Sequence, residues 1–556
     1  MPTIEVSRGD LCNLIGRRLS MKQLEEAVLY AKCEIDSADG DTLKLDCKDT
    51  NRPDLWSAEG VAREMAGRLG RPGLPAYRVG KSGVRVLVNP RLKAIRPYTV
   101  CAVVRNLNMT PDVLSQMIQL QEKVSMTFGR NRKEVAIGVY DLHRITSPIK
   151  FTTTAPDGIM FMPLEFSREM TPAQILKSHP KGREFGHLLE GMREYPVFID
   201  SAGEVLSMPP IINSDYTGKV TRETRDIFIE CSGFNLRFLL PALNVIASAL
   251  ADRGGKVETV EIDFGGGKKL VTPDLSPRKT RADLDFINKV SGLKLSMAQA
   301  RKLLEQARYA VKAHGRRMNL LYPAYRQDIM HMRDVAEDAV ISYGYNRIEP
   351  VPPRLATIGK TSDMETFSDR CARIMVGLGY QEILSYILTS KGKLFTRMLL
   401  PESDIVEIEN YVSENWNVFR NSLLPGMLEF LSRNNNQEYP QRIFEIGECV
   451  LPDPRQETRT RDVRKLSLAF TGNSAGYQDA SGALEALLSN LGVPFSLRAR
   501  KHPSFIPGRC ADVLLRNRPA GMVGEIHPQV LNNFGLKMPV AALELDVQEL
   551  NALSKN

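Results

Sequence analysis

Three stretches rich in glycine and proline divide this chain and limit the size of any single core. They are residues 68–83 (RLGRPGLPAYRVGKSG), 263–269 (DFGGGKK) and 351–359 (VPPRLATIG). Proline lacks a backbone donor and glycine loses much entropy when it is ordered, so helices and strands tend to end there. A chain of 556 residues is also too long for one hydrophobic core. The sequence therefore predicts four domains, at residues 1–80, 81–262, 268–350 and 355–556.

The spacing of hydrophobic residues predicts a multidomain α+β fold. Residues 1–80 combine helical spacing with an alternating strand, which indicates a small α+β domain. Residues 81–262 hold short β-branched runs separated by turns, with two long helical patterns among them, which predicts a mixed α/β domain. The glycines of 263–269 indicate a flexible hinge, because no serine or threonine follows the Gly-Lys pair as a phosphate loop requires. Residues 268–350 then predict a small α+β module.

The last predicted domain, residues 355–556, has the pattern of an antiparallel sheet flanked by helices. Several β-branched and aromatic runs lie between amphipathic stretches, and the predicted strands include 382–388 and 405–408. No repeat of fixed period and no low-complexity tract interrupts the pattern.

Charge and cysteine usage indicate a protein of the cytoplasm. The net charge of +9 is modest for this length and makes a nucleic-acid partner plausible without requiring one. The eight cysteines are scattered and contain no C-x-x-C pair, which argues against a zinc knuckle and a disulfide framework. The most apolar run, 238–251, contains Pro241 and is too short to span a bilayer, so we expect no membrane contact.

Residues 323–346 (PAYRQDIMHMRDVAEDAVISYGYN) carry a cluster of acids. The hydrophobic spacing predicts a helix over 331–343, on which three of these acids stand at i, i+3 and i+4. Gathered carboxylates suit a hard cation such as Mg²⁺, but the helix dipole also favours acids in a first turn. The pattern alone leaves both interpretations open. The four acids are Asp328, Asp334, Glu337 and Asp338.

Two stretches of the mixed α/β domain are further candidates for chemistry. Residues 178–187 (SHPKGREFGH) form a predicted loop with two histidines, Lys181 and Arg183, which suits either a phosphate-binding loop or a solvated basic loop. Residues 208–214 (MPPIINS) form an apolar run that ends in Asn213 and Ser214. No nucleophile with a neighbouring base is recognisable, so a nucleophilic triad is not supported.

Taken together, eight stretches resemble the family of phenylalanyl-tRNA synthetase β subunits, of the archaeal and eukaryotic type. They follow one another in the family's order across nearly the whole length. Together the eight stretches indicate the family more specifically than any one of them does alone. The stretches are NRPDLWSAEGVARE (51–64), AIGVYDL (136–142), HPKGREFGHLL (179–189), MPPIINS (208–214), the acid-bearing 323–346, NSLLPGMLEFLSRN (421–434), FEIGE (444–448) and HPSFIPGR (502–509).

The resemblance implies an α2β2 heterotetramer that attaches phenylalanine to tRNA(Phe) at the expense of ATP, with ATP and phenylalanine handled by the α subunit. It also implies that the central domain edits tRNA(Phe) wrongly charged with tyrosine, because an apolar pocket discriminates poorly against an added hydroxyl. Asn213 and Ser214 are the editing candidates. The acid-bearing module would carry Mg²⁺ on the four acids, in a structural or interfacial role.

The resemblance further implies that residues 355–556 are a degenerate class II synthetase fold that scaffolds the α subunit. No arginine follows the glycine-rich stretch 521–527, so we expect no catalytic residue for aminoacylation in this chain. Two other functions remain open. One is a stand-alone RNA-binding or assembly protein derived from a synthetase, and the other is a metal-dependent phosphohydrolase built on the four acids.

Overall fold

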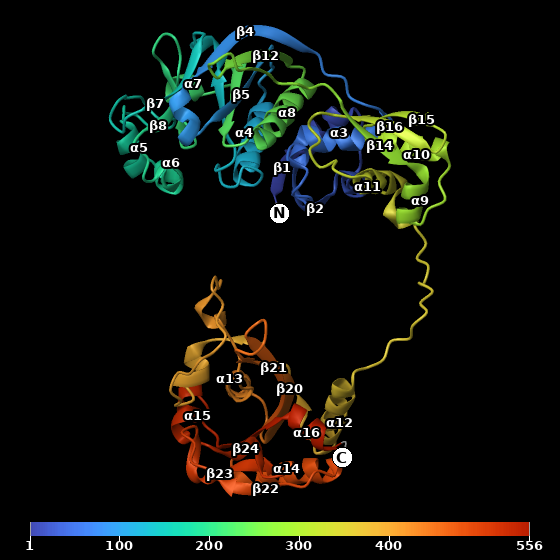
Figure 1. The fold of residues 1–556 in the computed structure, drawn as a ribbon, viewed down its shortest axis with the longest axis vertical. Helices are drawn as coiled ribbons and strands as arrows, with labels where there is room; N and C mark the ends of the chain where they lie inside the picture. The colour runs from blue at the N-terminus through green and yellow to red at the C-terminus, as the bar shows by residue number, and fades with distance from the viewer. Residues whose placement is uncertain (1, 555–556) are drawn as a thin grey trace. The chain divides into compact units, whose positions relative to one another are not determined.

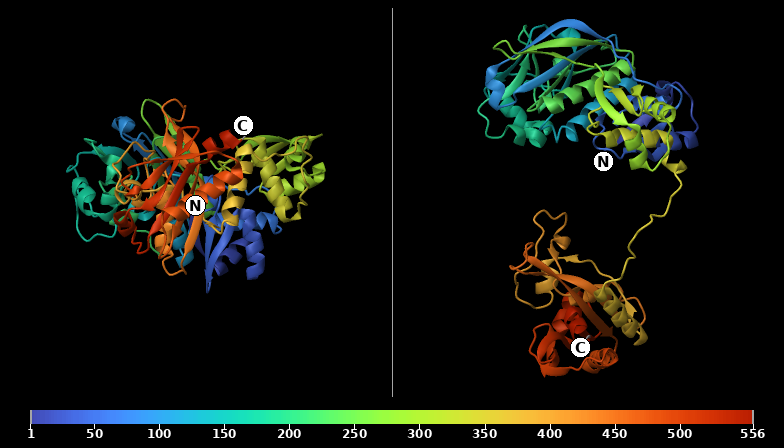
Figure 2. Two further views of the ribbon diagram at one scale, coloured as in Figure 1. Left: turned by 90° about the horizontal axis from the view of Figure 1, so that it is seen from below. Right: turned by 45° about the vertical axis from the view of Figure 1, so that its right-hand side comes forward.

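The computed structural model describes residues 2–554, which form two compact units (Figures 1 and 2). The division falls between Val351 and Pro352, inside the proline-rich stretch predicted to connect two domains. The first three predicted domains therefore lie within one unit, and each unit is described by itself. Among residues 2–554 the structure has no helix with the length and hydrophobicity that crossing a membrane requires.

The first unit begins with a three-stranded antiparallel sheet of order β1-β3-β2 and three helices. Ser20 and Ser57 are helix N-caps, each accepting a backbone N–H with its hydroxyl. The core of this region is continuous with residues from α4 (Pro111–Met126) and α8 (Leu236–Asp252) of the next region, so the two fold against one another. The elements are β1 (Thr3–Ser7), α1 (Arg8–Ile15), α2 (Met21–Val28), β2 (Cys33–Asp39), β3 (Thr42–Cys47) and α3 (Ala58–Arg68).

The centre of the first unit is a ten-stranded mixed sheet. Its strands are β4 (Val79–Val88), β5 (Tyr98–Arg105), β6 (Ala136–Asp141), β7 (Ile149–Thr154), β8 (Tyr195–Ile199), β9 (Val205–Met208), β10 (Ile212–Asn213), β11 (Ile227–Gly233), β12 (Lys256–Asp263) and β13 (Lys269–Thr272). The order is β10-β9-β8-β7-β4-β12-β5-β11-β6, and β13 pairs with β12. Figure 1 shows α4 (Pro111–Met126) and α8 (Leu236–Asp252) on the side of the sheet toward β1 and α3.

The glycines of 263–269 form a hairpin turn, so the prediction of a hinge there was wrong. Gly265, Gly266 and Gly267 all have positive φ, which only glycine adopts readily, and the chain reverses to pair β13 with β12. The large sheet therefore extends to Thr272, past the predicted boundary at 262. The first residues of the predicted module, 269–272, therefore belong to this sheet.

The module that completes the first unit is a three-stranded antiparallel sheet, β14-β16-β15, covered by three helices. The predicted helix over 331–343 is confirmed as α11, and His331 is its N-cap. Val335, Ala336 and Ala339 of α11 pack into the core of the module. The elements are β14 (Arg278–Asp283), α9 (Leu284–Ser291), α10 (Met297–Gln306), β15 (Ala310–His314), β16 (Arg317–Tyr322) and α11 (Met332–Tyr343).

The second unit is a seven-stranded sheet flanked by helices, as predicted. Its strands are β17 (Gln381–Glu382), β20 (Gln441–Pro452), β21 (Thr460–Thr471), β22 (Ser496–Ala499), β23 (Phe505–Leu515), β24 (Arg518–Ile526) and β25 (Val540–Asp546). The order is β17-β20-β21-β25-β24-β23-β22, antiparallel except for the β17–β20 pair. The helices include α12 (Asp363–Gly377), α13 (Leu424–Arg433), α14 (Tyr477–Leu491) and α15 (Pro528–Phe534).

Two strands predicted in this unit were wrong. The run 382–388 is broken, because β17 ends at Glu382 and only Leu388 and Thr389 form the next strand, β18 (Leu388–Thr389). The run 405–408 forms a single bridge, from Glu407 to Val418, because its neighbour β19 (Val418–Phe419) is only two residues long.

Candidate functional site

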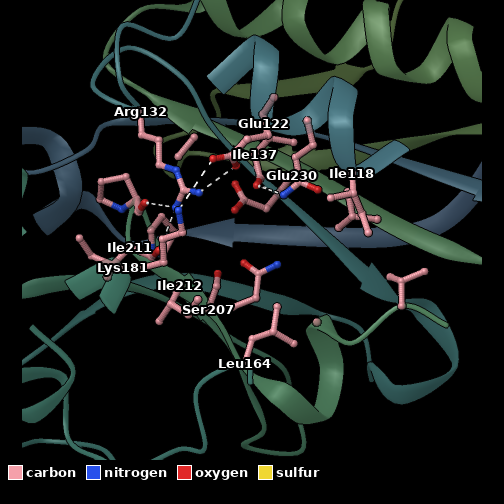
Figure 3. Close-up of a pocket in the computed structure, with 18 of the residues that line it drawn as sticks. Ile118, Glu122, Arg132, Ile137, Leu164, Lys181, Ser207, Ile211, Ile212 and Glu230 are labelled. Carbon is pink, nitrogen blue, oxygen red and sulfur yellow. Dashed lines mark hydrogen bonds and ion pairs between the residues drawn. The ribbon is translucent and has the colours of Figure 1, made fainter. Parts of the chain in front are cut away.

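A pocket of about 370 Å³ lies in the first unit, between α4, the strands β6 and β11, and the predicted site segment 208–214 (Figure 3). This volume lies within the range of small-molecule sites and exceeds that of one aromatic side chain. The wall is mostly apolar. Its apolar residues include Met117, Ile118, Ile137, Val139, Leu164, Pro209, Pro210, Ile211, Ile212 and Val220.

The two predicted editing residues differ in their position at this pocket. Asn213 lines it, at the end of the apolar run, as the sequence suggested. Ser214 is buried and is not among the lining residues. Its hydroxyl instead accepts the Thr217 N–H at the start of α7 (Asp215–Gly218), so it acts as a helix cap.

Glu230 is a pocket residue that the sequence analysis did not identify. It lies on β11, is 2% exposed, and lines the cavity. Burial raises the pKa of its carboxyl to about 8, although the charge of Arg96 opposes the shift. One carboxyl oxygen, Oε2, is buried without a hydrogen-bond partner. A lone acid in the apolar run Ile227–Gly233 was the available signal, since an unpaired buried acid is costly and uncommon.

Arg132 joins opposite walls of the pocket (Figure 3). Its guanidinium donates to the carbonyls of Pro210 and Ile211, at 3.3 and 3.0 Å, and to the Glu122 carboxylate at 3.2 Å. It also lies 4.3 Å from the centre of the Phe185 ring. Arg130, Asn131 and Arg132 all have positive φ. Such a left-handed run is unfavourable for residues with a side chain, and backbone strain of this kind clusters at functional sites.

The predicted loop at 178–187 is helical, which corrects that expectation. Residues 172–185 form α5 (Pro172–Ser178) and α6 (Pro180–Phe185). His179 lines the pocket, but both ring nitrogens are engaged, Nδ1 by the Lys181 N–H and Nε2 by the Leu164 carbonyl. Lys181 also lines the pocket, whereas His187 does not. No lining serine therefore has a free histidine base beside it.

The four predicted metal ligands do not converge on one point. Asp328 and Asp338 are both bound by Arg326, which donates two hydrogen bonds to Asp328 at 2.8 and 2.6 Å and one to Asp338 at 2.9 Å. The Tyr309 hydroxyl donates to Asp338 at 2.7 Å. Although burial acts to raise it, the charges of Arg326 and Arg52 lower the pKa of the Asp328 carboxyl to about 2.

The other two acids lie nearer the surface and have separate partners. Asp334 accepts the backbone N–H groups of Met330 and His331 at the start of α11. Glu337 pairs with Lys32 of the N-terminal region at 2.7 Å, and its side chain is 47% exposed. Across residues 2–554, no three histidine, cysteine or acidic side chains are placed so that they could hold a metal ion together.

Arg326 belongs to a buried ion network that reaches the N-terminal region. Arg52 pairs with Asp54 and Glu64 at 2.8 and 2.9 Å, and lies 3.7 Å from Asp328. Arg52 and Arg326 are 2% and 1% exposed. The network therefore joins two of the stretches that carry the family resemblance, 51–64 and 323–346. Burial of this degree is tolerated because each arginine has more than one carboxylate partner.

In the second unit, the glycine-rich stretch 521–527 runs along β24 into α15. The helix begins at Pro528 with His527 as its N-cap, and its sequence PQVLNNF contains no arginine. The buried Arg420 of this unit is neutralised by Glu445 at 2.7 Å and donates to the Ser385 hydroxyl at 2.9 Å.

Comparison with known families matches three parts of the chain. The model described as the phenylalanyl tRNA synthetase beta chain CLM domain matches residues 348–547. The tRNA synthetase B5 domain matches residues 280–345, and the B3/4 domain matches residues 81–244. The pocket lies in the B3/4 match and α11 in the B5 match.

Relatives match over the full length. The phenylalanine–tRNA ligase beta subunits of Pyrococcus abyssi and Pyrococcus horikoshii are each 47% identical to this chain over 558 residues, covering 99% of this chain and 100% of the relative. A crystal structure of an N-terminal fragment of the phenylalanyl-tRNA synthetase beta subunit from Pyrococcus horikoshii aligns with a TM-score of 0.60 and 50% identity. It covers 62% of this chain and 100% of that fragment.

Replacing Arg326 by Met should destabilise the first unit by about 3–5 kcal/mol, because the change leaves the buried carboxylates Asp328 and Asp338 without their countercharge. The measurement is thermal and denaturant unfolding of the purified chain. Arg333→Met, at an exposed position of α11, is the matched control and should change stability little. Equal stability of the two variants would contradict the assigned role of Arg326.

The loss of stability caused by Arg326→Met should depend on pH. The folded pKa of Asp328, about 2, lies below its usual value of 3.8, so its stabilising contribution is complete above about pH 4 and is lost as the pH falls through 2. The stability difference between Arg326→Met and the unchanged chain should therefore shrink between pH 5 and pH 2.

Proposed function

This chain belongs to the family of phenylalanine–tRNA ligase β subunits, and from that membership we propose that its pocket is the proofreading site of the ligase. The ligase joins L-phenylalanine to tRNA(Phe) with conversion of ATP to AMP and diphosphate. In our proposal a partner α subunit carries out that synthesis, in an α2β2 assembly in the cytoplasm. No observation favours the alternative of a stand-alone RNA-binding or assembly protein.

Proofreading is needed because phenylalanine and tyrosine differ only by one hydroxyl. An apolar synthetic site excludes tyrosine weakly, whereas a site with a polar group placed for the hydroxyl rejects phenylalanine strongly. The observation that carries the proposal is Glu230, a buried carboxyl among the residues that line an apolar cavity able to hold an aromatic ring. A tyrosine hydroxyl would give this carboxyl a further hydrogen-bond partner, and phenylalanine would not.

The lining residues support hydrolysis by a bound water without a covalent intermediate. The water oxygen adds to the ester carbonyl, the bond to the ribose oxygen breaks, and that oxygen receives a proton as tyrosine leaves. Arg132 and Lys181 place positive charge at the pocket, which suits both the developing negative charge and the phosphates of the tRNA end. Glu122, which Arg132 holds at 3.2 Å, is the nearest candidate to orient the water.

Glu230→Ala should lower kcat/KM for hydrolysis of tyrosyl-tRNA(Phe) by about 10- to 100-fold, because the substrate hydroxyl loses a buried partner. The assay measures deacylation by the assembled ligase with preformed tyrosyl-tRNA(Phe). Ser214→Ala removes a helix cap that does not line the pocket, so it should leave the preference for tyrosine over phenylalanine unchanged. Unaltered tyrosine hydrolysis in Glu230→Ala would overturn the assignment of this pocket.

We further propose that the second unit is a non-catalytic class II-like fold that supports the α subunit. The lack of an arginine at the start of α15 and the internal neutralisation of Arg420 by Glu445 support this interpretation. A catalytic class II site would have to present arginines to the phosphates of ATP.

The purified chain alone should therefore form no phenylalanyl-adenylate, whereas addition of the α subunit should restore synthesis. Exchange of radioactive diphosphate into ATP in the presence of phenylalanine measures this step. Sustained exchange by the chain without its partner would refute the scaffold assignment.

Magnesium binding also remains a proposal, with two of the four predicted carboxylates as ligands. Asp328 and Asp338 are compensated by Arg326, so they do not fit as free ligands. Asp334 and Glu337 stand at i and i+3 on α11, and Mg²⁺ in proteins commonly takes one or two carboxylates and keeps several waters. The Glu337 side chain is 47% exposed, and the ion would replace Lys32 as its partner. These two residues would hold the ion, and the ion would supply positive charge at a surface. The arrangement gives no support to a phosphohydrolase.

Glu337→Gln should weaken Mg²⁺ binding to the assembled ligase several-fold, as measured by calorimetric titration with MgCl2. Glu25→Gln, an equally simple change at an exposed position of α2, is the control and should have no effect. Identical Mg²⁺ affinities for the two variants would remove Glu337 from the ligand set.

A further inference from the structure

The hydroxyl of Tyr140 lies behind the pocket and connects three of its polar residues. Tyr140 is on β6, is fully buried, and does not itself line the cavity. Its oxygen is 2.8 Å from Ser207 Oγ, 3.2 Å from Glu230 Oε1 and 3.4 Å from Asn213 Oδ1. These three residues come from β9, β11 and β10, and all three line the pocket. One hydroxyl therefore links the polar groups of three strands.

We propose that Tyr140 is a positioning residue, which orients Glu230 so that the pocket accepts a hydrogen bond from a tyrosine hydroxyl and thereby selects tyrosine over phenylalanine. This inference rests on the proposed proofreading function. Tyr140 does not touch the substrate. In this proposal it affects the preference for tyrosine over phenylalanine and takes no part in the hydrolysis itself.

The direction of the hydrogen bonds follows from the protons available. Burial raises the pKa of the Tyr140 phenol, so Tyr140 carries its proton at neutral pH. It can donate this proton to Ser207 Oγ at 2.8 Å or to Glu230 Oε1 at 3.2 Å. The contact with Oε1 fixes the orientation of the Glu230 carboxyl group.

The strand that carries Tyr140 leaves room for its phenol at Gly138. Gly138 stands two residues before Tyr140 on β6 and is paired with Glu230 across the sheet. A Cβ at Gly138 would lie only 2.0 Å from the Tyr140 oxygen and 2.5 Å from its ring carbon Cζ. Residue 138 must therefore lack a side chain for Tyr140 to reach its three partners.

The ring of Tyr140 has a separate packing role that a substitution can preserve. It packs against Phe228 with ring centres 6.0 Å apart and lies in an apolar cluster with Phe151 and Phe198. Tyr140→Phe keeps this packing and removes only the hydroxyl. Gly138→Ala keeps the hydroxyl and displaces it.

The test measures hydrolysis of tyrosyl-tRNA(Phe) and phenylalanyl-tRNA(Phe) by the assembled ligase. Tyr140→Phe should lower kcat/KM for tyrosyl-tRNA by about tenfold, with little change for phenylalanyl-tRNA, so the ratio of the two falls. Gly138→Ala should lower the same ratio. Tyr77→Phe is the matched control: it removes a hydroxyl that bonds Asp252 at 3.0 Å, remote from the pocket, and should leave the ratio unchanged.

A double-mutant cycle separates positioning from general stability. If Tyr140 acts through Glu230, then Tyr140→Phe in a Glu230→Gln background should cost much less selectivity than it does alone. Equal losses in both backgrounds, or equal losses for the two substrates, would overturn the inference while leaving the proofreading function standing. Failure of the unchanged ligase to hydrolyse tyrosyl-tRNA(Phe) would instead refute both.

Discussion

The buried ion network around Arg52 and Arg326 is the constraint on which the first unit depends. These two arginines bring together segments that are far apart in the chain, one before the large sheet and one after it. Neither segment could bury its charges alone, because an isolated buried charge is strongly unfavourable. The pairing therefore joins two regions that flank the ten-stranded sheet in the sequence and lie against each other in the structure. It also explains why acids that suggest a metal site in the sequence are compensated by an arginine in the structure.

The polar groups of the pocket are less fully paired than those of the ion network. In the ion network each charged group has several partners, whereas Glu230 has an unpaired oxygen and the backbone at Arg130–Arg132 is left-handed. Such local costs are tolerated where the surrounding structure is rigid, and here the cavity is walled by a large sheet and by α4. Stability and selectivity are thus carried by different clusters of the same unit, and a change in one should be separable from a change in the other.

Local sequence signals predicted the elements well and the contacts poorly. The helix α11 could be predicted because hydrophobic spacing acts over a few residues. The glycines at 265–267 were misread, since the same residues suit a hinge or a hairpin and only the pairing of β13 decides. Asn213 was proposed from its position after an apolar run, and the structure places it at the pocket. Glu230 and Arg326 were missed because their roles depend on partners brought together by tertiary folding.

The separation of Arg52 from Arg326 along the chain has a consequence for biosynthesis. As the polypeptide leaves the ribosome, Arg52 and its neighbours emerge early, while Asp328 and Arg326 follow only after the whole large sheet has been made. Until then the N-terminal side of the ion network lacks its partner residues and is exposed to the solvent and to other chains. The first unit can therefore complete its fold only after residues up to Asp338 have emerged from the ribosome.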